Sequence, residues 1–323
     1  MSGGNLPYHL RVKKEIERRL FVEQLRLISK IHDFEEYAYI GMAGPFSEDF
    51  KIMYDRFNFK HFFSYETEES VYKRQSFNIP FTHINYINNK ISTVLDQYPQ
   101  IEIKDSTSVI EASKAVLWLD YTGFDYQLLN DFERAITTLE SGSVIKITLL
   151  AHVSKFYSSA TEPMTIVREN RVRKINEVLG ENYFLADVFT QEKMTEKDFP
   201  LTIFELLKKI SYSALRGGKT KFLPISSYIY QDGMTMITFT GMIINQDQED
   251  TFLQKTGLKE WIYGLQASPL PLKIEVPFLS LKEKLNLDAC LPNNPSNLDY
   301  FEGLEFQSYE KFHRFYPTYA KIF

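Results

Sequence analysis

The sequence predicts an α/β protein whose central sheet is mostly parallel, is covered by helices on both faces and ends in an antiparallel β-hairpin. Short, almost continuously apolar runs alternate with helical stretches, which is typical of parallel strands buried on both faces. Two long β-rich runs, 221–230 and 234–244, follow the last of these helical stretches. Gln231-Asp232-Gly233 joins them, and Asp-Gly between two such runs is a strong hairpin signal.

The length of 323 residues allows one large α/β core and an extension. We expect an N-terminal helical segment at 1–34, the core at 35–245 and a C-terminal extension at 246–323 that packs on the core. Residues 10–31 predict an amphipathic helix. The run 309–319 is too aromatic for a solvated tail, so it should pack against the core.

Composition narrows the class of protein. The net charge is −5, whereas a duplex-binding domain is usually basic, so nucleic acid is not indicated as a partner. One cysteine, Cys290, excludes an internal disulfide framework, and the six histidines lack metal-ligand spacing, so no metal is predicted. The N-terminus has no apolar signal core, and no run approaches the roughly 18 apolar residues of a membrane span. These features predict a cytoplasmic protein without a membrane partner.

The elements of the core follow in a regular order. Strands are predicted for the apolar runs 37–40, 61–65, 82–87, 115–119 and 143–151. Helices are expected at 47–57, with Ser47 as N-cap, and at 68–78, 126–140, 164–180 and 201–216. A series of five βα units followed by an antiparallel hairpin is typical of the class I methyltransferase sheet. By fold-level analogy, we therefore expect a Rossmann-like, doubly wound sheet of that type.

The turn after the first strand, Gly41-Met42-Ala43-Gly44, is the first candidate site. Glycine lets the backbone approach a cofactor that lies across a strand end. The helix that follows offers free N–H groups, which would meet the amino-acid part and ribose of S-adenosylmethionine (SAM). An ordinary βα turn is the alternative, since Gly-x-x-Gly alone is a weak signal.

Glu66 ends the second strand, 25 residues after Gly41. An acidic residue about 20 positions beyond a glycine turn is placed to bind both hydroxyls of a ribose. The alternative is that Glu66 is a solvent-facing charge without a binding role. A nicotinamide-binding fold also has a glycine turn and an acid, but the full Gly-x-Gly-x-x-Gly is absent and the hairpin favours SAM.

The fourth strand ends in Asp120 and Tyr121, at the edge where such sheets bind ligands. Asp120 could orient an acceptor or the methionine amine, and Tyr121 could wall the transfer site. Amino-methyltransferases of DNA bases carry Asn/Asp-Pro-Pro-aromatic here, and the missing prolines count against base methylation. His152, after the fifth strand, could serve as a general base, although a lone histidine there is more often structural.

Several motifs together resemble a family of uncharacterised bacterial proteins described as putative O-methyltransferases. The resemblance runs from Tyr8 to the C-terminal aromatic residues. It rests on Tyr8-x-Leu10-Arg11-x-x-Lys14-x-x-Glu17-Arg18, Tyr39-Ile40-Gly41-Met42-Ala43-Gly44-Pro45-Phe46-Ser47-Glu48-Asp49-Phe50, Glu66, Val71-Tyr72-Lys73-Arg74-Gln75-x-Phe77-Asn78-x-Pro80, Trp118-Leu119-Asp120-Tyr121-x-Gly123, Tyr230-x-Asp232-Gly233-x-x-Met236 and Arg314-Phe315-Tyr316-Pro317.

The resemblance implies a SAM-binding fold more firmly than it implies an O-methyl acceptor. Together with the candidates above, it supports SAM binding by Gly41, Met42, Ala43, Gly44, Glu66 and Asp120 and catalytic roles for Asp120 and Tyr121. It also points to cofactor or substrate contacts from Arg11, Lys14, Arg18, Arg74 and Asn78, for which a plain solvated helix face is the alternative. Ala43 stands where many relatives have glycine, and its methyl group could crowd the cofactor. The relatives look like products of genes in mobile and antiviral-defence regions, which suggests a defence role.

Two other classes of function stay open at this point. The chain could be a non-catalytic module that acts through protein partners, which a pocket filled by Met42 or Phe46 would support. It could also be a SAM-using enzyme that does not transfer methyl, such as a lyase. No short motif encodes the methyl acceptor, because pocket shape and loops determine it.

Overall fold

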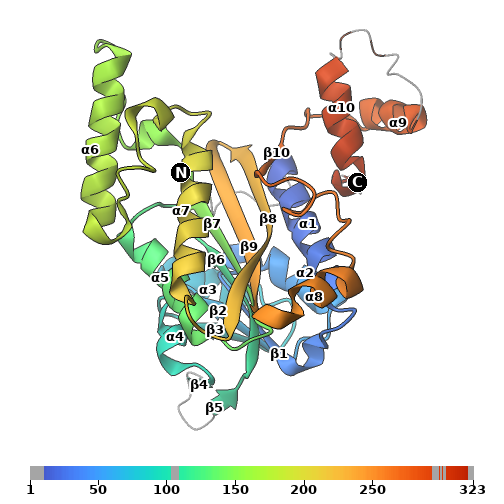
Figure 1. The fold of residues 1–323 in the computed structure, drawn as a ribbon. Helices are drawn as coiled ribbons and strands as arrows, with labels where there is room; N and C mark the ends of the chain where they lie inside the picture. The colour runs from blue at the N-terminus through green and yellow to red at the C-terminus, as the bar shows by residue number, and fades with distance from the viewer. Residues whose placement is uncertain (1–10, 103–108, 293–297, 299, 301–302, 319–323) are drawn as a thin grey trace.

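The computed structural model describes residues 11–102, 109–292, 298, 300 and 303–318. An eight-stranded sheet forms its centre, in the order β10-β8-β9-β7-β6-β1-β2-β3 (Figure 1). The strands are β1 (Tyr37–Gly41), β2 (His61–Tyr65), β3 (Ile84–Ile87), β6 (Lys114–Asp120), β7 (Val144–Leu150), β8 (Thr220–Asp232), β9 (Met234–Asn245) and β10 (Leu272–Ile274). A separate antiparallel pair is formed by β4 (Gln100–Glu102) and β5 (Val109–Glu111).

The directions of the strands identify the fold. The five strands β3, β2, β1, β6 and β7 are parallel to one another. β9 is antiparallel to both β7 and β8 and lies between them. This is the Rossmann-like sheet of the class I methyltransferases, so the predicted fold class is confirmed. β10, which the sequence reading did not predict, extends the sheet by pairing in parallel with β8.

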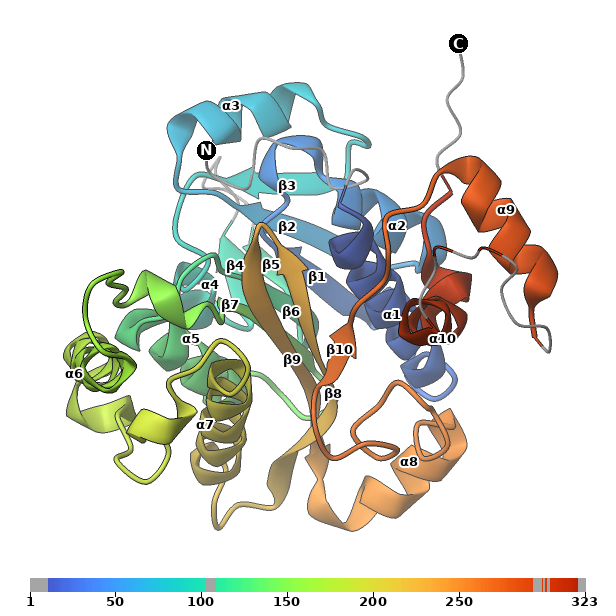
Figure 2. The same ribbon diagram turned by 90° about the horizontal axis from the view of Figure 1, so that it is seen from above.

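Helices cover both faces of the sheet (Figure 2). One side carries α1 (Val12–Ile28), α2 (Glu48–Arg56), α8 (Glu249–Thr256), α9 (Leu281–Cys290) and α10 (Gly303–Phe312). The other side carries α4 (Thr93–Gln97), α5 (Tyr126–Thr138), α6 (Met164–Tyr183) and α7 (Phe199–Ala214), while α3 (Glu69–Phe77) lies near β3 at the edge of the sheet. No helix among the described residues has both the length and the apolar character that a membrane crossing needs.

Alternate residues of each strand belong to different cores, because successive side chains of a strand point to opposite faces. Ile145, Ile147 and Leu149 of β7 belong to the apolar cluster that includes α5 and α7. Between them, Lys146 is fully buried on the opposite face, where it contacts Phe21 of α1. The α1 face is therefore polar at its centre, although it is closed to solvent.

The start of α2 differs from the prediction. Ser47 does precede the helix, but its φ of 50° is left-handed and its hydroxyl does not cap a backbone N–H. The Ser47 hydroxyl instead forms a 2.8 Å hydrogen bond with the Tyr86 hydroxyl of β3. Ser47 therefore occupies the predicted N-cap position, but its hydroxyl makes a tertiary hydrogen bond in place of the local capping bond.

The aromatic residues near the C-terminus are buried against α1. Tyr309, Phe312, Phe315 and Tyr316 all lie in the core cluster on the α1 face. The Tyr263 hydroxyl donates to the backbone carbonyl of Lys311 at 2.7 Å and ties this segment to the chain after α8. Tyr8 and Tyr319, which the sequence reading also singled out, lie outside the described residues.

Candidate active site

The glycine turn lies at the carboxyl edge of the sheet. Gly41 is the last residue of β1, and Gly44 has a φ of 58°, which L side chains rarely adopt. The Ala43 N–H donates to the Ser64 hydroxyl of β2 at 3.2 Å, and Ala43 is fully buried in the core of the α1 face. The methyl group of Ala43 is therefore packed into the protein. A Cβ on Gly41 would make only ordinary 3.6 Å contact with Phe50, so packing alone does not require glycine there.

The helix α3 packs on this turn through two residues that the resemblance marks as contacts. The Asn78 side-chain amide donates to the Pro45 carbonyl at 2.9 Å. The Arg74 guanidinium lies over the Phe46 ring, 4.8 Å from its centroid. The structure thus brings Arg74 and Asn78 to the glycine turn, where they fix the turn by contacts with protein atoms.

Glu66 follows β2 at the same edge and is half-buried. Its Oε1 accepts the Glu68 N–H at 2.8 Å, and its Oε2 makes no hydrogen bond within the described part of the chain. The neighbouring Tyr65 hydroxyl is buried and lacks a hydrogen-bond partner among the described residues. The end of β2 therefore carries a carboxylate oxygen and a buried hydroxyl without protein partners, and both groups suit the hydroxyls of a ribose or the edge of a purine.

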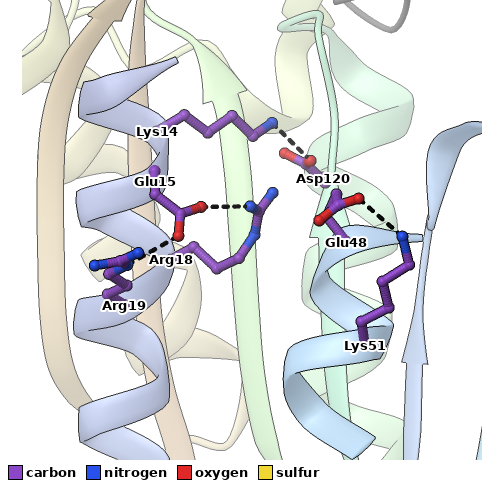
Figure 3. Close-up of polar contacts among 7 residues, drawn as sticks. All are labelled: Lys14, Glu15, Arg18, Arg19, Glu48, Lys51 and Asp120. Atoms are coloured by element: carbon purple, nitrogen blue, oxygen red, sulfur yellow. Dashed lines mark hydrogen bonds and ion pairs between the residues drawn. The ribbon is translucent and has the colours of Figure 1, made fainter. Parts of the chain in front are cut away.

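Asp120, the last residue of β6, is held by the N-terminal helix (Figure 3). The Lys14 ammonium lies 2.9 Å from Asp120 Oδ2, and the two side chains are 9% and 15% exposed. Burial raises the pKa of the Asp120 carboxyl, but the charge of Lys14 and its hydrogen bond, together with the charge of Lys146, bring that pKa below its ordinary value. Asp120 is therefore a carboxylate at neutral pH.

The other basic residues predicted on α1 reach different environments. Arg18 is buried and donates to Glu15 at 2.9 Å, and in Figure 3 its side chain points from α1 toward β6. Arg11 is half-buried and precedes the first turn of α1. The buried Asp49 of α2 accepts the Tyr39 hydroxyl at 2.9 Å, and burial raises the Asp49 pKa although the charge of Arg18 opposes this.

A fully buried ion pair lies behind Asp120, and the sequence reading missed it. Lys146 of β7 and Glu17 of α1 are 2.7 Å apart, and neither side chain is exposed. The Lys146 ammonium also lies 3.5 Å from the ring centroid of Trp118. Burial lowers the pKa of Lys146 to about 8, against the opposing effect of Glu17. The available signal was a single charge inside the apolar run 143–151.

The Tyr121 side chain takes a different direction from the one its predicted role suggests. Its hydroxyl donates to Asp131 Oδ2 of α5 at 2.8 Å. Burial and the charge of Asp131 raise its pKa well above the ordinary value. The hydroxyl is thus a hydrogen-bond donor to α5 and is poorly suited to exchange protons, while the role of Tyr121 in the wall of a transfer site stays a prediction.

Comparison with solved structures returns methyltransferases at low similarity. Trm1 from Pyrococcus horikoshii, solved with SAM, is 9% identical, with 74% of this chain and 57% of that chain covered and a TM-score of 0.42. The N-methyltransferase NodS from Bradyrhizobium japonicum WM9, solved with S-adenosylhomocysteine (SAH), is 10% identical, with 72% and 88% covered and a TM-score of 0.37. TYW2 from M. jannaschii, solved with AdoMet, is 12% identical, with 69% and 75% covered and a TM-score of 0.33.

Comparison with protein families identifies the family of this chain, which the comparison with solved structures does not. No curated protein matches the chain. One family model, described as "Putative O-methyltransferase", matches residues 6–323. Because this match spans almost the whole chain and the sheet has the class I methyltransferase order, the protein belongs to this putative O-methyltransferase family.

Proposed function

We propose that the protein transfers a methyl group from SAM to an acceptor that binds at the carboxyl edge of the sheet. The observation that carries this proposal is the convergence of three strand ends at that edge. Gly41 ends β1, Glu66 follows β2 and Asp120 ends β6, and these strands are neighbours in the order β6-β1-β2. Ligands of open α/β sheets bind at this edge.

The residues at the edge fit SAM in three respects. Gly41 ends β1 without a side chain, so the backbone of the turn can be approached closely, and a Cβ there would make only ordinary contacts with Phe50 and Asp49. Glu66 keeps one carboxylate oxygen for the ribose hydroxyls. The orphaned hydroxyl of Tyr65 gains a partner if the nucleoside lies beside it. Gly41 to Gly44, Glu66 and Tyr65 would therefore hold the nucleoside and the amino-acid part.

The contribution of the protein to methyl transfer is alignment and exclusion of water. SAM supplies an electrophilic methyl group on a sulfonium. The carboxylate of Asp120 would face the cationic part of that molecule, and the ion pair with Lys14 fixes its position. The buried pair of Glu17 and Lys146 keeps α1 seated on the sheet beside Asp120.

The first test is isothermal titration calorimetry with SAM and with SAH, comparing the wild type with Glu66→Ala. We expect micromolar binding that the substitution weakens at least tenfold, or about 1.4 kcal/mol. Glu69→Ala is the matched control, because Glu69 is an exposed carboxylate of the same region that pairs with Lys73 at 3.2 Å. Its affinity for SAM should equal that of the wild type.

The result separates the alternatives. Folded protein that binds neither SAM nor SAH would sink the methyltransferase proposal and leave a non-catalytic module that acts through protein partners. Binding followed by release of methylthioadenosine instead of SAH would indicate a lyase. The role in antiviral defence stays a prediction from the resemblance.

A further inference from the structure

His152 lies at the same edge of the sheet as the candidate cofactor site. It is the second residue after β7, and its backbone is extended, with φ −106° and ψ 97°. β7 is the neighbour of β6, and Thr148 of β7 is paired with Asp120. Four residues of extended chain, at about 3.3 Å each, separate Thr148 from His152. His152 is therefore within about 15 Å of Asp120, on the side of β6 that faces away from β1 and β2.

Glu196 faces the imidazole ring of His152. Its Oε2 lies 3.1 Å from His152 Nδ1. Its other oxygen, Oε1, accepts the backbone N–H of Ser154 at 3.0 Å and also the Ser154 hydroxyl. The carboxylate is thus fixed by two donors on one oxygen while the second oxygen is directed at the histidine. The N–H direction at His152 is not aligned for a full hydrogen bond, as is common in catalytic pairs before substrate binds.

A buried arginine holds both sides of this pair. Arg171 of α6 donates to the Ser154 hydroxyl at 3.0 Å, to the Tyr157 carbonyl at 3.0 Å and to the Met194 carbonyl at 2.8 Å. Its side chain is buried. Because Ser154 and Tyr157 follow His152 while Met194 precedes Glu196, the guanidinium fixes the two chain segments relative to each other.

The two ring nitrogens of His152 differ in environment. Nδ1 is buried and faces Glu196. Nε2 makes no hydrogen bond within the described residues and is not among the buried polar atoms, and the side chain is 29% exposed. A carboxylate on Nδ1 favours the tautomer that carries its proton there, which leaves a lone pair on the accessible Nε2. Glu196 also lines a cavity of about 110 Å³ at this edge, together with Lys13 of α1 and Thr235 of β9.

We propose that His152 is the general base for a hydroxyl acceptor and that Glu196 is its positioning residue. The inference rests on the proposed methyl transfer. The acceptor oxygen forms a bond to the methyl carbon while the carbon–sulfur bond of SAM breaks. The electron pair of the broken bond stays on sulfur, so the sulfonium becomes a thioether. The hydroxyl proton passes to His152 Nε2. A hydroxyl needs such a base because it must lose its proton as it attacks, and a positioned base contributes about 10²–10⁴-fold.

The positioning role is tested by ¹H–¹⁵N correlation spectra of the histidine rings, which need neither SAM nor an acceptor. We expect His152 in the wild type to carry its proton on Nδ1 and to have a bare Nε2. In Glu196→Ala this preference should be lost, while the ring of His61, at the start of β2, keeps its wild-type signals. A proton on Nε2 of His152 in the wild type would overturn the proposal.

The base is tested by transfer of labelled methyl from SAM to phenol, catechol and 4-nitrophenol, with aniline as the amine counterpart. We expect transfer to the hydroxyl probes and a loss of about 100-fold or more in His152→Gln, with SAM affinity within twofold of wild type by calorimetry. His61→Gln is the matched control and should keep its activity.

The outcomes distinguish this inference from the proposed function. Unchanged transfer in His152→Gln would exclude His152 as the base. Transfer to aniline alone, or tight SAM binding with no transfer to any hydroxyl probe, would overturn the assignment of a hydroxyl acceptor. Failure of SAM binding would overturn the proposed function itself, whereas the tautomer of His152 would still decide whether Glu196 positions it.

Discussion

The two faces of the sheet bury different kinds of side chain, although the same strands form both. Toward α5 and α7 the strands present aliphatic and aromatic residues, including Ile145, Ile147 and Phe239. Toward α1 the intervening positions of the same strands include the fully buried Lys146 and Thr148. One face is an apolar core, and the other is a core with charges at its centre.

The difference shows that one face of the sheet mainly stabilises the fold, whereas the other face determines the position of α1. Apolar contacts are non-directional, so the face under α5 and α7 stabilises the fold without fixing one register closely. A buried charge is tolerated only when an opposite charge is paired with it, so the pair of Glu17 and Lys146 fixes one position of α1 on the sheet. In that position Lys14 reaches Asp120 at the carboxyl edge.

The largest expected effect is the loss of one partner of the fully buried pair. Lys146→Met leaves the Glu17 carboxylate buried without its counter-charge, and we expect the free energy of unfolding to fall by about 3–5 kcal/mol. The double variant Glu17→Met with Lys146→Met removes both charges and should recover most of that loss. Urea unfolding measures both.

A variant on the opposite face serves as the control for this cycle. Ile147 neighbours Lys146 in the chain but belongs to the apolar cluster, so Ile147→Ala should cost about 2–5 kcal/mol for its own cavity. Combined with Glu17→Met, its effect should be additive to within about 0.5 kcal/mol. A double Glu17 and Lys146 variant as unstable as Lys146→Met alone would show that the charges do not act as a pair.

A smaller effect is expected from Lys14→Met, which removes the partner of Asp120 at the edge of the same face. We expect a loss of about 2 kcal/mol at pH 7, the usual size for a hydrogen bond between charged groups. Urea unfolding compares it with Lys13→Met, whose ammonium has no carboxylate within 4.0 Å among the described residues. That control should stay within about 0.5 kcal/mol of wild type.

The pH dependence of Lys14→Met follows from the lowered pKa of Asp120. A carboxylate whose pKa is lower in the folded state stabilises the fold above its unfolded pKa of about 3.9. That contribution is lost as the pH falls through the folded pKa. The difference between wild type and Lys14→Met should therefore be full at neutral pH and shrink below about pH 4. A difference that grows on acidification would contradict the role of Lys14 in lowering the Asp120 pKa.

The sequence predicted the fold well because parallel strands buried on both faces must be almost continuously apolar. The run 61–65 coincides with β2, and the Asp-Gly turn lies between β8 and β9. β10 escaped prediction because it has only three residues and lies in a segment rich in proline. Its strand character comes from pairing with β8 and not from its own pattern.

The residues of the candidate site could be predicted only in part, and for a different reason. Asp120 and His152 could be singled out because each follows an apolar run. Their partners, Lys14 and Glu196, come from distant parts of the chain, and only the tertiary fold brings each pair together. The charge of Lys146 within an apolar run was the one available signal for the missed pair, and nothing in its neighbourhood points to Glu17. Pairings between distant side chains leave no periodic signal.

The smallest expected effect is at the partly exposed ion pair of Glu48 and Lys51 on α2, which is drawn in Figure 3. Its 2.9 Å separation equals that of Lys14 and Asp120, but its side chains are 28% and 42% exposed. Solvent screens such a pair, so Lys51→Ala should cost less than about 1 kcal/mol, and added salt should reduce the difference further. Urea unfolding at low and high salt measures it. If Lys51→Ala cost as much as Lys14→Met, separation rather than burial would decide the strength of these pairs.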